Sequence, residues 1–418
     1  MIALSVLARL PWVLIVHPKP VSDTRFYYFS AQSIAEGHGY QILSHPTAFF
    51  PVGWPAFLGG LFFFTGPSML AIEVLNLILW AVVAALVYVL GRRLDGRATG
   101  VVAGVLTALS PTMAIYVMRA YSEALFIPLL LIVCLLLTSR RETPSLRNAV
   151  LAGVFLGAAI LVRSTAEMLI LILPLWLLLR RPRRESWRAA LALGVAACLV
   201  LAPWVARNKV VMHTASLSTN GGVTLWLGSN PRATGGWIDY GKHNWAIKSA
   251  ATEVKQNNEL TRDAISYAIH HPGRYFSLLP PKFTRLMGWS TSPLTIVELE
   301  QSGPDPSVPH PARTSTRKLD STERSLLGGA LARTWAFELW HYVYWVLGGV
   351  ALLLAVWRRR PTVDIAALLI VAWILFHVLF IHGEPRYMLS VEPLVAPALA
   401  WLLVRGAAEA RRLGRSAR

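Results

Sequence analysis

Long apolar runs alternate with short polar segments along most of the chain. Charged side chains are nearly absent inside these runs and gather at their ends. A helix needs about 20 mostly apolar residues to cross a bilayer. Runs of roughly this kind lie near residues 1–17, 68–91, 98–117, 121–138, 148–162, 165–180, 189–206, 336–357, 363–381 and 388–404. The pattern therefore predicts an all-α polytopic membrane protein with about 10 transmembrane helices, in a range of 9–12.

Three features of the N-terminal part modify this picture. The apolar stretch Phe49–Gly66 contains Pro51, Pro55 and several glycines. A further crossing there would invert the charge pattern described below, so we expect a re-entrant or surface-lying element. The residues that follow Asp23 place mostly apolar side chains at helical spacing, which predicts an interfacial helix. The first span is short and begins at Met1, which suggests a truncated start, and it lacks the cleavage site of a removable signal peptide.

The polar segments divide the chain into four parts. We expect an N-terminal transmembrane module with a first outer loop, a small extracytoplasmic loop domain of mixed structure, C-terminal transmembrane helices and a basic cytoplasmic tail; their bounds are 1–206 with the loop at 18–66, 207–335, 336–404 and 405–418. Within the loop domain, Glu253–His270 has a helical pattern, whereas 290–335 matches no pattern that we can name. No glycine-rich loop follows a strand and opens a helix, so a nucleotide-binding domain is not expected.

Composition and charge agree with this topology. Hydrophobic residues make up 55% of the 418 positions and charged residues 15%, with a net charge of +18. Most of the excess lies beside the predicted spans, at Arg92, Arg93, Arg97, Arg140, Arg141, Arg147, Arg180, Arg181, Arg183, Arg184, Arg188, Arg358, Arg359, Arg360, Arg405, Arg411, Arg412, Arg415 and Arg418. Basic loops of this kind stay in the cytoplasm, which places both termini there. The partner of this charge is then the lipid bilayer, because a nucleic-acid partner requires a basic surface on one folded face.

Cysteine and acidic residues suggest no cofactor. Cys134 and Cys198 both fall inside apolar runs, so neither a disulfide framework nor a cysteine metal site is expected. The acidic residues are too few and too scattered to define a metal site. No metal ligands are therefore assigned from the residues.

Four polar clusters fall on the loops that the charge rule places outside. In the first, Ser22 and Asp23 begin the predicted interfacial helix. The simplest interpretation is that Ser22 caps this helix and Asp23 favours its dipole. The functional interpretation is that the Asp23 carboxylate acts as a general base at the membrane edge.

The other three clusters carry cations. Arg119 precedes Glu123 by four residues, and Arg163 precedes Glu167 by the same spacing, so local ion pairs are the simplest interpretation. Arg163 can also extend to lipid phosphates. The last cluster, His382–Tyr387, contains Arg386, and arginine and tyrosine both donate hydrogen bonds to phosphate. One candidate base and several cations at one membrane face together indicate an enzyme that acts on a phosphate-bearing lipid.

Several of these segments resemble a known superfamily. The segments are Asp23-Thr-Arg-Phe-Tyr-Tyr, Pro51-Val-Gly-Trp54-Pro55, Tyr121-Ser-Glu123, Pro203-Trp204-Val-Ala-Arg207-Asn208, His271-Pro272…Lys282 and Glu384-Pro-Arg386-Tyr387. In this order they resemble the GT-C superfamily of polytopic glycosyltransferases, nearest to its protein O-mannosyltransferase and aminoarabinose-transferase branch. The resemblance covers about 20–290 and 336–404 of the chain.

The resemblance implies an activity. In the family, the acid at the position of Asp23 deprotonates an acceptor hydroxyl, which attacks a polyprenyl-phosphate sugar with inversion. Glu123 corresponds to a second acidic position that assists the acceptor or a divalent cation. The donor phosphate would be bound by Arg386 with Tyr387, then by Arg163, Arg119, Arg207 and Lys282. In the O-mannosyltransferases a second acid follows the first, whereas Thr24 follows here, which puts a protein acceptor in doubt.

The implied function is the transfer of a hexosyl or pentosyl group from a polyprenyl-phosphate donor to a glycan, lipid or protein acceptor. The active site would lie on the extracytoplasmic side of a plasma or inner membrane. Another enzyme of polyprenyl lipids, such as a polysaccharide ligase or polymerase, remains an alternative because it also needs basic outer residues. A transporter is the alternative from another class, although transporters carry ionisable residues at the bilayer midplane, where this chain has few.

Overall fold

The computed structural model describes residues 1–15, 20, 22–138, 143–180, 184–238, 249–288, 334–358 and 361–416. Helices dominate these ranges. The strands found in them are β1 (Gln41–Ile42) and β2 (His45–Pro46), which form one antiparallel pair with Gln41 opposite Pro46. The predicted all-α polytopic fold is confirmed.

The membrane-spanning part consists of long and short apolar helices. Five described helices are long and apolar enough to cross a membrane: α4 (Met69–Asp95), α10 (Arg184–Val211), α17 (Thr334–Trp357), α18 (Pro361–Phe380) and α20 (Ala396–Ser416). A sixth crossing is formed if α5 (Arg97–Ala108) continues, through a 48° bend, into α6 (Pro111–Ile115) and η1 (Tyr116–Met118). Shorter apolar helices are α1 (Ile2–Ile15), α3 (Gly53–Thr65), α7 (Glu123–Leu137), α8 (Leu146–Val162) and α9 (Leu169–Arg180), the last preceded by η2 (Ser164–Met168). Each predicted span therefore overlaps a helix, but five or six, rather than ten, have the length of a full crossing.

Small residues let the helices approach closely. On α8, a Cβ added at Gly153 would lie 2.3 Å from the carbonyl oxygen of Leu193 on α10, and one at Gly157 would lie 2.9 Å from that of Ala197. Helix pairs in membranes associate through packing of this kind, because the surrounding lipid offers no hydrophobic driving force between them. Packing of α8 against α10 positions the C-terminal end of α8, where Arg163 is the capping residue.

The break between α5 and α6 is compensated by polar side chains inside the bundle. Pro111 starts α6, and the Ser110 hydroxyl accepts a hydrogen bond from the Met113 amide at 3.4 Å. The fully buried Arg9 of α1 donates to the carbonyl oxygens of Ala108, at 2.7 Å, and Thr107, at 3.3 Å. Backbone groups freed by a helix break in a membrane need such partners, because lipid provides none.

The first outer loop forms α2 (Ser22–Ala35), the strand pair and α3. Helices α2 and α3 pack against each other, and Gly59 of α3 allows a close approach to Ala31 and Ile34 of α2. The indole nitrogen of the fully buried Trp54 donates to the Ala120 carbonyl at 2.8 Å, which ties α3 to the segment before α7. The predicted interfacial helices are therefore present, and α3, with 13 residues, is too short for a crossing.

A second group of helices lies beside the outer loop. It comprises α11 (Gly221–Gly228), α12 (Ala250–His270), α13 (Pro272–Ser277) and α14 (Leu279–Met287). The predicted helix at Glu253–His270 is confirmed and begins three residues earlier, where Ser249 and Thr252 form a capping box. Leu260 and Ala264 of α12 pack against apolar side chains of α11 in a separate small core. Between 207 and 288 the described residues contain no strand, so the expected mixed structure is not seen there. Residues 289–333 lie outside the described ranges, and the four-part domain division stays a prediction.

The C-terminal part differs from the expected straight span at 388–404. A short helix α19 (Pro385–Leu389) is followed by η4 (Glu392–Leu394), and α20 starts at Ala396 and continues to Ser416, through most of the predicted tail. Alanine, arginine and glutamate after residue 405 favour helix, so the helix does not end at the membrane edge. Arg405 Nε donates to Asp95 Oδ2 at 2.7 Å and joins α20 to the end of α4.

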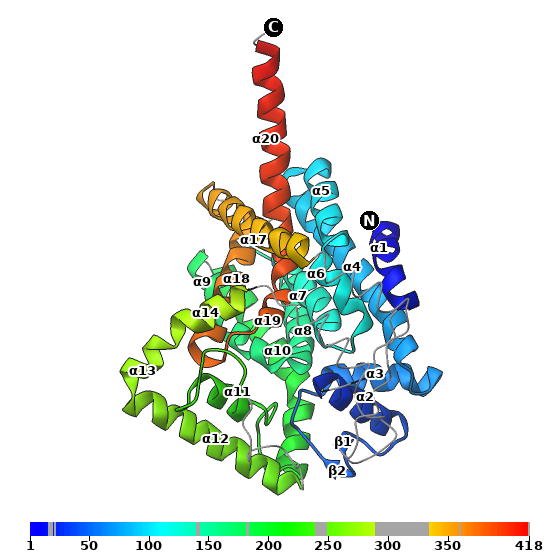
Figure 1. Cartoon of the computed structure of the whole chain (residues 1–418), viewed down its shortest axis with the longest axis vertical. Coiled ribbons are helices and arrows are strands. Elements are labelled where there is room, and N and C mark those ends of the chain that lie inside the picture. The colour runs from blue at the N-terminus through cyan, green and yellow to red at the C-terminus, as the bar shows by residue number, and fades with distance from the viewer. Residues whose placement is uncertain are drawn as a thin grey trace.

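The protruding end of α20 and the outer loop lie at opposite ends of the molecule. Figure 1 shows the end of α20 at one end, the N-terminus of α1 in the same half of the molecule beside α4 and α5, and α2, the strand pair and α12 at the other end.

Candidate functional site

A cavity of about 550 Å³ opens where the outer loop meets the helix bundle. Its walls come from the start of α2, the loop before α3, the segment before α7, the end of α8, α11, and the connection between α18 and α19. Charged and aromatic side chains line it, among them Asp23, Tyr27, Tyr121, Arg163, Arg386 and Tyr387.

Asp23 lies in the first turn of α2, where it faces the cavity. Its Oδ2 accepts a hydrogen bond from Arg386 Nη2 at 2.9 Å, and 28% of its side chain is exposed. Tyr27, one turn further along α2, packs its ring against Phe50 with 4.9 Å between centroids. Burial, together with the charge of Asp23, raises the pKa of Tyr27, so this phenol remains protonated beside the carboxylate.

Arg386 is surrounded by carboxylates and aromatic rings. Its Nε lies 3.7 Å from Glu384 and 3.8 Å from Glu123, and its guanidinium lies 4.6 Å from the centre of the Tyr121 ring. Burial alone would lower the pKa of Arg386, but Glu384 and Asp23, followed by other acidic groups, raise it well above its ordinary value. The guanidinium is therefore a permanent positive charge at the cavity wall.

Glu123 and Arg163 form a largely buried ion pair at this wall, in which Arg163 lines the cavity and Glu123 lies behind it. Arg163 Nη1 lies 2.6 Å from Glu123 Oε1, with 10% and 1% of the two side chains exposed. The same Arg163 nitrogen is 3.4 Å from the Ser122 hydroxyl. The sequence predicted local pairs at a spacing of four residues, whereas Glu123 pairs with an arginine 40 residues away, because the end of α8 lies beside the start of α7.

The connection before α19 contributes a small polar network. Tyr387 Oη and His382 Nε2 are 3.2 Å apart, and His382 Nε2 lies 3.7 Å from Glu384 Oε2. Burial would raise the pKa of Glu384, but Arg386 and His382 outweigh it and lower the pKa to about 2. Trp373 of α18 stabilises this turn, since its indole nitrogen donates a hydrogen bond to the Tyr387 carbonyl at 2.8 Å.

Four of the predicted site residues line the cavity: Asp23, Arg163, Arg386 and Tyr387. Glu123 lies directly behind two of them. Glu384 and Tyr121 also line the cavity and were not assigned from the sequence, although both stand in the motifs that carried the resemblance. Their proximity to acidic or basic partners far along the chain is not visible in the sequence.

The other three predicted phosphate ligands lie elsewhere. Arg207 donates to the carbonyl oxygens of Thr47, at 2.8 Å, and Tyr40, at 3.1 Å, and so supports the backbone of the first outer loop. Lys282 is fully buried, with its ammonium 5.3 Å from the Tyr275 ring, and burial lowers its pKa to about 8. Arg119 is also buried and lies over the Tyr121 ring at 4.9 Å. None of the three is among the residues that line the cavity.

Glu253 of α12 fixes the loop that forms one wall of the cavity. Its carboxylate accepts hydrogen bonds from the Thr47 hydroxyl at 2.8 Å, from the Ala48 amide at 2.9 Å and from the Thr219 hydroxyl. The next residues of this loop, 49–51, line the cavity. Glu253 therefore positions a wall of the site without lying in it.

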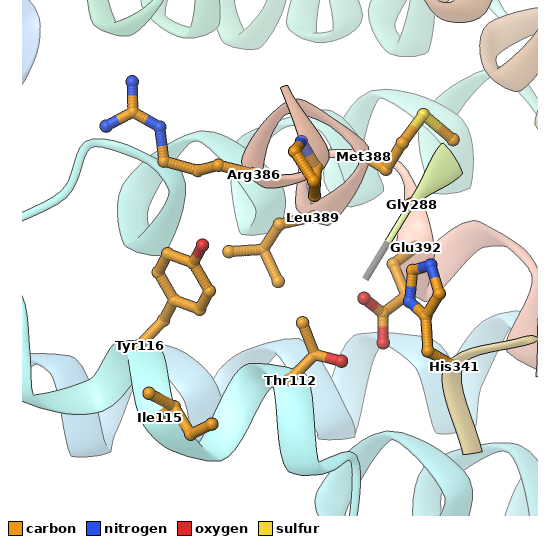
Figure 2. Close-up of a pocket in the computed structure, with 10 residues that line it drawn as sticks. Thr112, Ile115, Tyr116, Gly288, His341, Arg386, Met388, Leu389 and Glu392 are labelled. Carbon is orange, nitrogen blue, oxygen red and sulfur yellow. The ribbon is translucent and has the colours of Figure 1, made fainter. Parts of the chain in front are cut away.

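A second, smaller pocket lies on the other side of α19. It has a volume of about 20 Å³ and is lined by side chains that include Thr112, His341 and Glu392. Figure 2 shows Arg386 at its edge, with the guanidinium pointing away from Glu392 and His341. A space of this size holds about one water molecule, so it is too small for a sugar phosphate. Among the described residues, no three His, Cys, Asp or Glu side chains are placed to hold a metal ion.

Residues 46–206 match the family model described as dolichyl-phosphate-mannose-protein mannosyltransferase, a segment that includes Glu123 and Arg163 but not Asp23. The comparison with curated proteins found no match.

Solved structures of similar fold cover almost the whole chain. ArnT from Cupriavidus metallidurans, bound to undecaprenyl phosphate, matches 96% of the chain with a TM-score of 0.56 and 14% identity. The oligosaccharyltransferase of Archaeoglobus fulgidus in its apo form matches 100% of the chain with a TM-score of 0.54 and 13% identity. The chain spans only 59% and 51% of the length of these two proteins. The chain therefore has the fold of the GT-C glycosyltransferases and resembles, over residues 46–206, their protein mannosyltransferase family.

Proposed function

We propose that the protein is an inverting glycosyltransferase that moves a sugar from a polyprenyl-phosphate donor to an acceptor hydroxyl at the extracytoplasmic membrane face. The observation that carries the proposal is the meeting of the Asp23 carboxylate and the Arg386 guanidinium, at 2.9 Å, on the wall of a cavity of about 550 Å³. A base and a permanent cation are the two groups that this reaction requires.

The chemistry follows from these groups. Asp23 accepts the proton of the acceptor hydroxyl, while the hydroxyl oxygen forms a bond to the anomeric carbon. The bond between that carbon and the phosphate oxygen breaks, and the electron pair leaves with the carrier phosphate. Attack from the face opposite the leaving group inverts the anomeric carbon. The proton need only be taken late in the attack, so an exposed carboxylate suffices as the base.

The carrier phosphate would be bound by Arg386, Arg163 and Tyr387, all of which line the cavity. Arginine presents paired N–H groups that match phosphate oxygens, and its charge stabilises the leaving phosphate. The ArnT structure of similar fold is described as bound to undecaprenyl phosphate, which supports a polyprenyl phosphate as the carrier. Glu123 would act as a positioning residue for the two arginines.

The side of the membrane is argued from charge. Arg92 and Arg93 in the last turn of α4, and Arg405 of α20, which pairs with Asp95 at the end of α4, support a cytoplasmic position for this end of the bundle. The outer loop that contributes Asp23 lies at the other end (Figure 1). This arrangement supports an extracytoplasmic site.

The proposal is tested with the purified full chain in lipid nanodiscs. A panel of polyprenyl-phosphate sugars is offered with candidate glycan, lipid and peptide acceptors, and released polyprenyl phosphate is measured. We expect transfer from at least one donor, its loss in D23N, and its retention in the matched control D263N, which changes an exposed acid of α12. Release that is absent for every donor, or equal in D23N and the wild type, would refute the assignment.

A further inference from the structure

Four charged side chains of the site alternate in sign along one line of contacts. Asp23 pairs with Arg386 at 2.9 Å, Arg386 approaches Glu123 at 3.8 Å, and Glu123 pairs with Arg163 at 2.6 Å. The acids come from the starts of α2 and α7, and the arginines from the end of α8 and from α19. In this arrangement the candidate base is bound to a candidate phosphate ligand.

The two ion pairs differ in their access to the cavity. In the Glu123–Arg163 pair, 1% and 10% of the side chains are exposed, and of the two only Arg163 lines the cavity. In the Asp23–Arg386 pair, 28% and 15% are exposed, and both residues line the cavity. A charged ligand that enters the cavity therefore reaches both residues of the second pair, but only the arginine of the first pair.

Arg386 retains partners when Asp23 leaves it. Glu384 lies 3.7 Å from its Nε, Glu123 lies 3.8 Å away, and the Tyr121 ring lies 4.6 Å below the guanidinium. Its Nη2 atom, by contrast, donates to Asp23. The guanidinium can therefore keep its place while the group bound at Nη2 changes.

We propose that the donor phosphate and Asp23 compete for Arg386, so that binding of the donor releases Asp23 to act as the base. This inference rests on the proposed function. A phosphate oxygen replaces the Asp23 carboxylate as the acceptor of the Nη2 hydrogen bond, and the freed oxygen of Asp23 turns to the acceptor hydroxyl. A neutral hydroxyl cannot displace a carboxylate from a guanidinium, because it brings no compensating charge. The donor consequently binds first, and the base is exposed only when the donor is present.

The proposed exchange predicts how neutralisation of Asp23 changes the affinity of the protein for the carrier phosphate. If Asp23 served only as a base, its neutralisation would change binding of the carrier phosphate only through lost charge repulsion, which would remain in the absence of Arg386. If Asp23 competes for Arg386, its neutralisation strengthens that binding, since no carboxylate has to be displaced. The gain must also vanish when Arg386 is absent, because the two residues then have nothing to share.

The experiment measures binding of undecaprenyl phosphate without sugar to the full chain in nanodiscs. We expect D23N and D23S to bind it about three- to tenfold more tightly than the wild type, the range of a partly exposed ion pair. In an R386A background, D23N should give no gain, and the control D263N should bind like the wild type. Affinity in D23N and D23S that is equal to or weaker than wild type would overturn the exchange. A second arm uses inorganic phosphate, and equally tight binding of it would overturn the assignment of the competing ligand as a lipid headgroup.

A measurement on the unmodified chain guards against variants that fail to fold. A carboxyl-specific diazo reagent, followed by mass spectrometry, reports the reactivity of Asp23. We expect undecaprenyl phosphate to increase its labelling, whereas protection of Asp23 by the lipid would overturn the exchange. The two proposals fail separately. Sugar transfer by the wild type without tighter binding in D23N refutes only the exchange, and a wild type that transfers no sugar refutes the proposed function.

Discussion

Glu123 and Arg163 form an ion pair of 2.6 Å that joins the first turn of α7 to the end of α8. Only 1% of the Glu123 side chain is exposed, whereas Arg163, with 10% exposed, lines the cavity. Removing one partner of a buried pair leaves the other charge without compensation, which is costly in an environment of low polarity.

We therefore expect R163A to lower the free energy of unfolding by about 3 kcal/mol. Thermal or denaturant unfolding of the purified protein in detergent measures the change. The matched control is E259Q, which breaks an exposed pair with Lys255 on α12 and should cost about 0.5 kcal/mol or less. Equal losses in the two variants would show that the Glu123–Arg163 pair is not a structural joint.

Arg386 is expected to determine donor affinity. Replacing it with alanine removes a hydrogen-bonded charge that lines the cavity, and we expect the donor KM to rise by about tenfold or more. The donor KM of R386K should lie between those of the wild type and R386A, because lysine keeps the positive charge but lacks the planar, paired N–H donors of arginine. The control is R262A, which removes an exposed arginine of α12. An unchanged KM in R386A would exclude a phosphate role for Arg386.

Glu253 is expected to act on the site through the first outer loop. The variant E253A removes the acceptor of the Thr47, Ala48 and Thr219 hydrogen bonds. We expect faster hydrogen exchange of the loop amides around Ala48 and a loss of about 1–3 kcal/mol of stability. Replacing Glu259, an exposed acid of the same helix, should leave the exchange at Ala48 unchanged and should cost about 0.5 kcal/mol or less. Unaltered exchange at Ala48 in E253A would contradict the anchoring role.

Lys282 provides a test by pH. Burial lowers its pKa from 10.5 to about 8 in the folded chain. Between these pH values the unfolded chain binds a proton that the folded chain has lost, so the free energy of unfolding rises as pH increases from about 8 to 10.5. K282M should be more stable than the wild type at pH 7 and should lose this rise. The sequence suggested a phosphate role for Lys282, and a large loss of donor affinity in K282M would restore it.

The sequence predicted the fold through two independent signals. Apolar runs located helices such as α4, α10 and α18, because an apolar run is a local property of one segment, and the arginine clusters predict their orientation. These signals did not predict the C-terminal end of α20. Its arginines were interpreted as a tail, although alanine and glutamate between them continue the helix to Ser416.

The candidate site was predicted less completely, for a physical reason. Asp23 and Arg386 were both proposed, but their contact joins positions 363 residues apart and depends on how helices pack. Arg207 was chosen for its charge alone, and the structure shows its guanidinium bound to backbone carbonyls of the first outer loop. Residue type and local spacing identify groups able to bind phosphate, whereas tertiary packing decides which of them reach the cavity.

The close contact at Gly153 has a consequence for residues that it never touches. A methyl group at Gly153 would lie 2.3 Å from the Leu193 carbonyl oxygen of α10, which is too close for van der Waals contact. Helix α8 would then have to shift or tilt relative to α10. Arg163 lies at the C-terminal end of α8, so this movement would separate its guanidinium from the Glu123 carboxylate. A substitution deep in the lipid-embedded bundle would thereby disturb the charged wall several helical turns away.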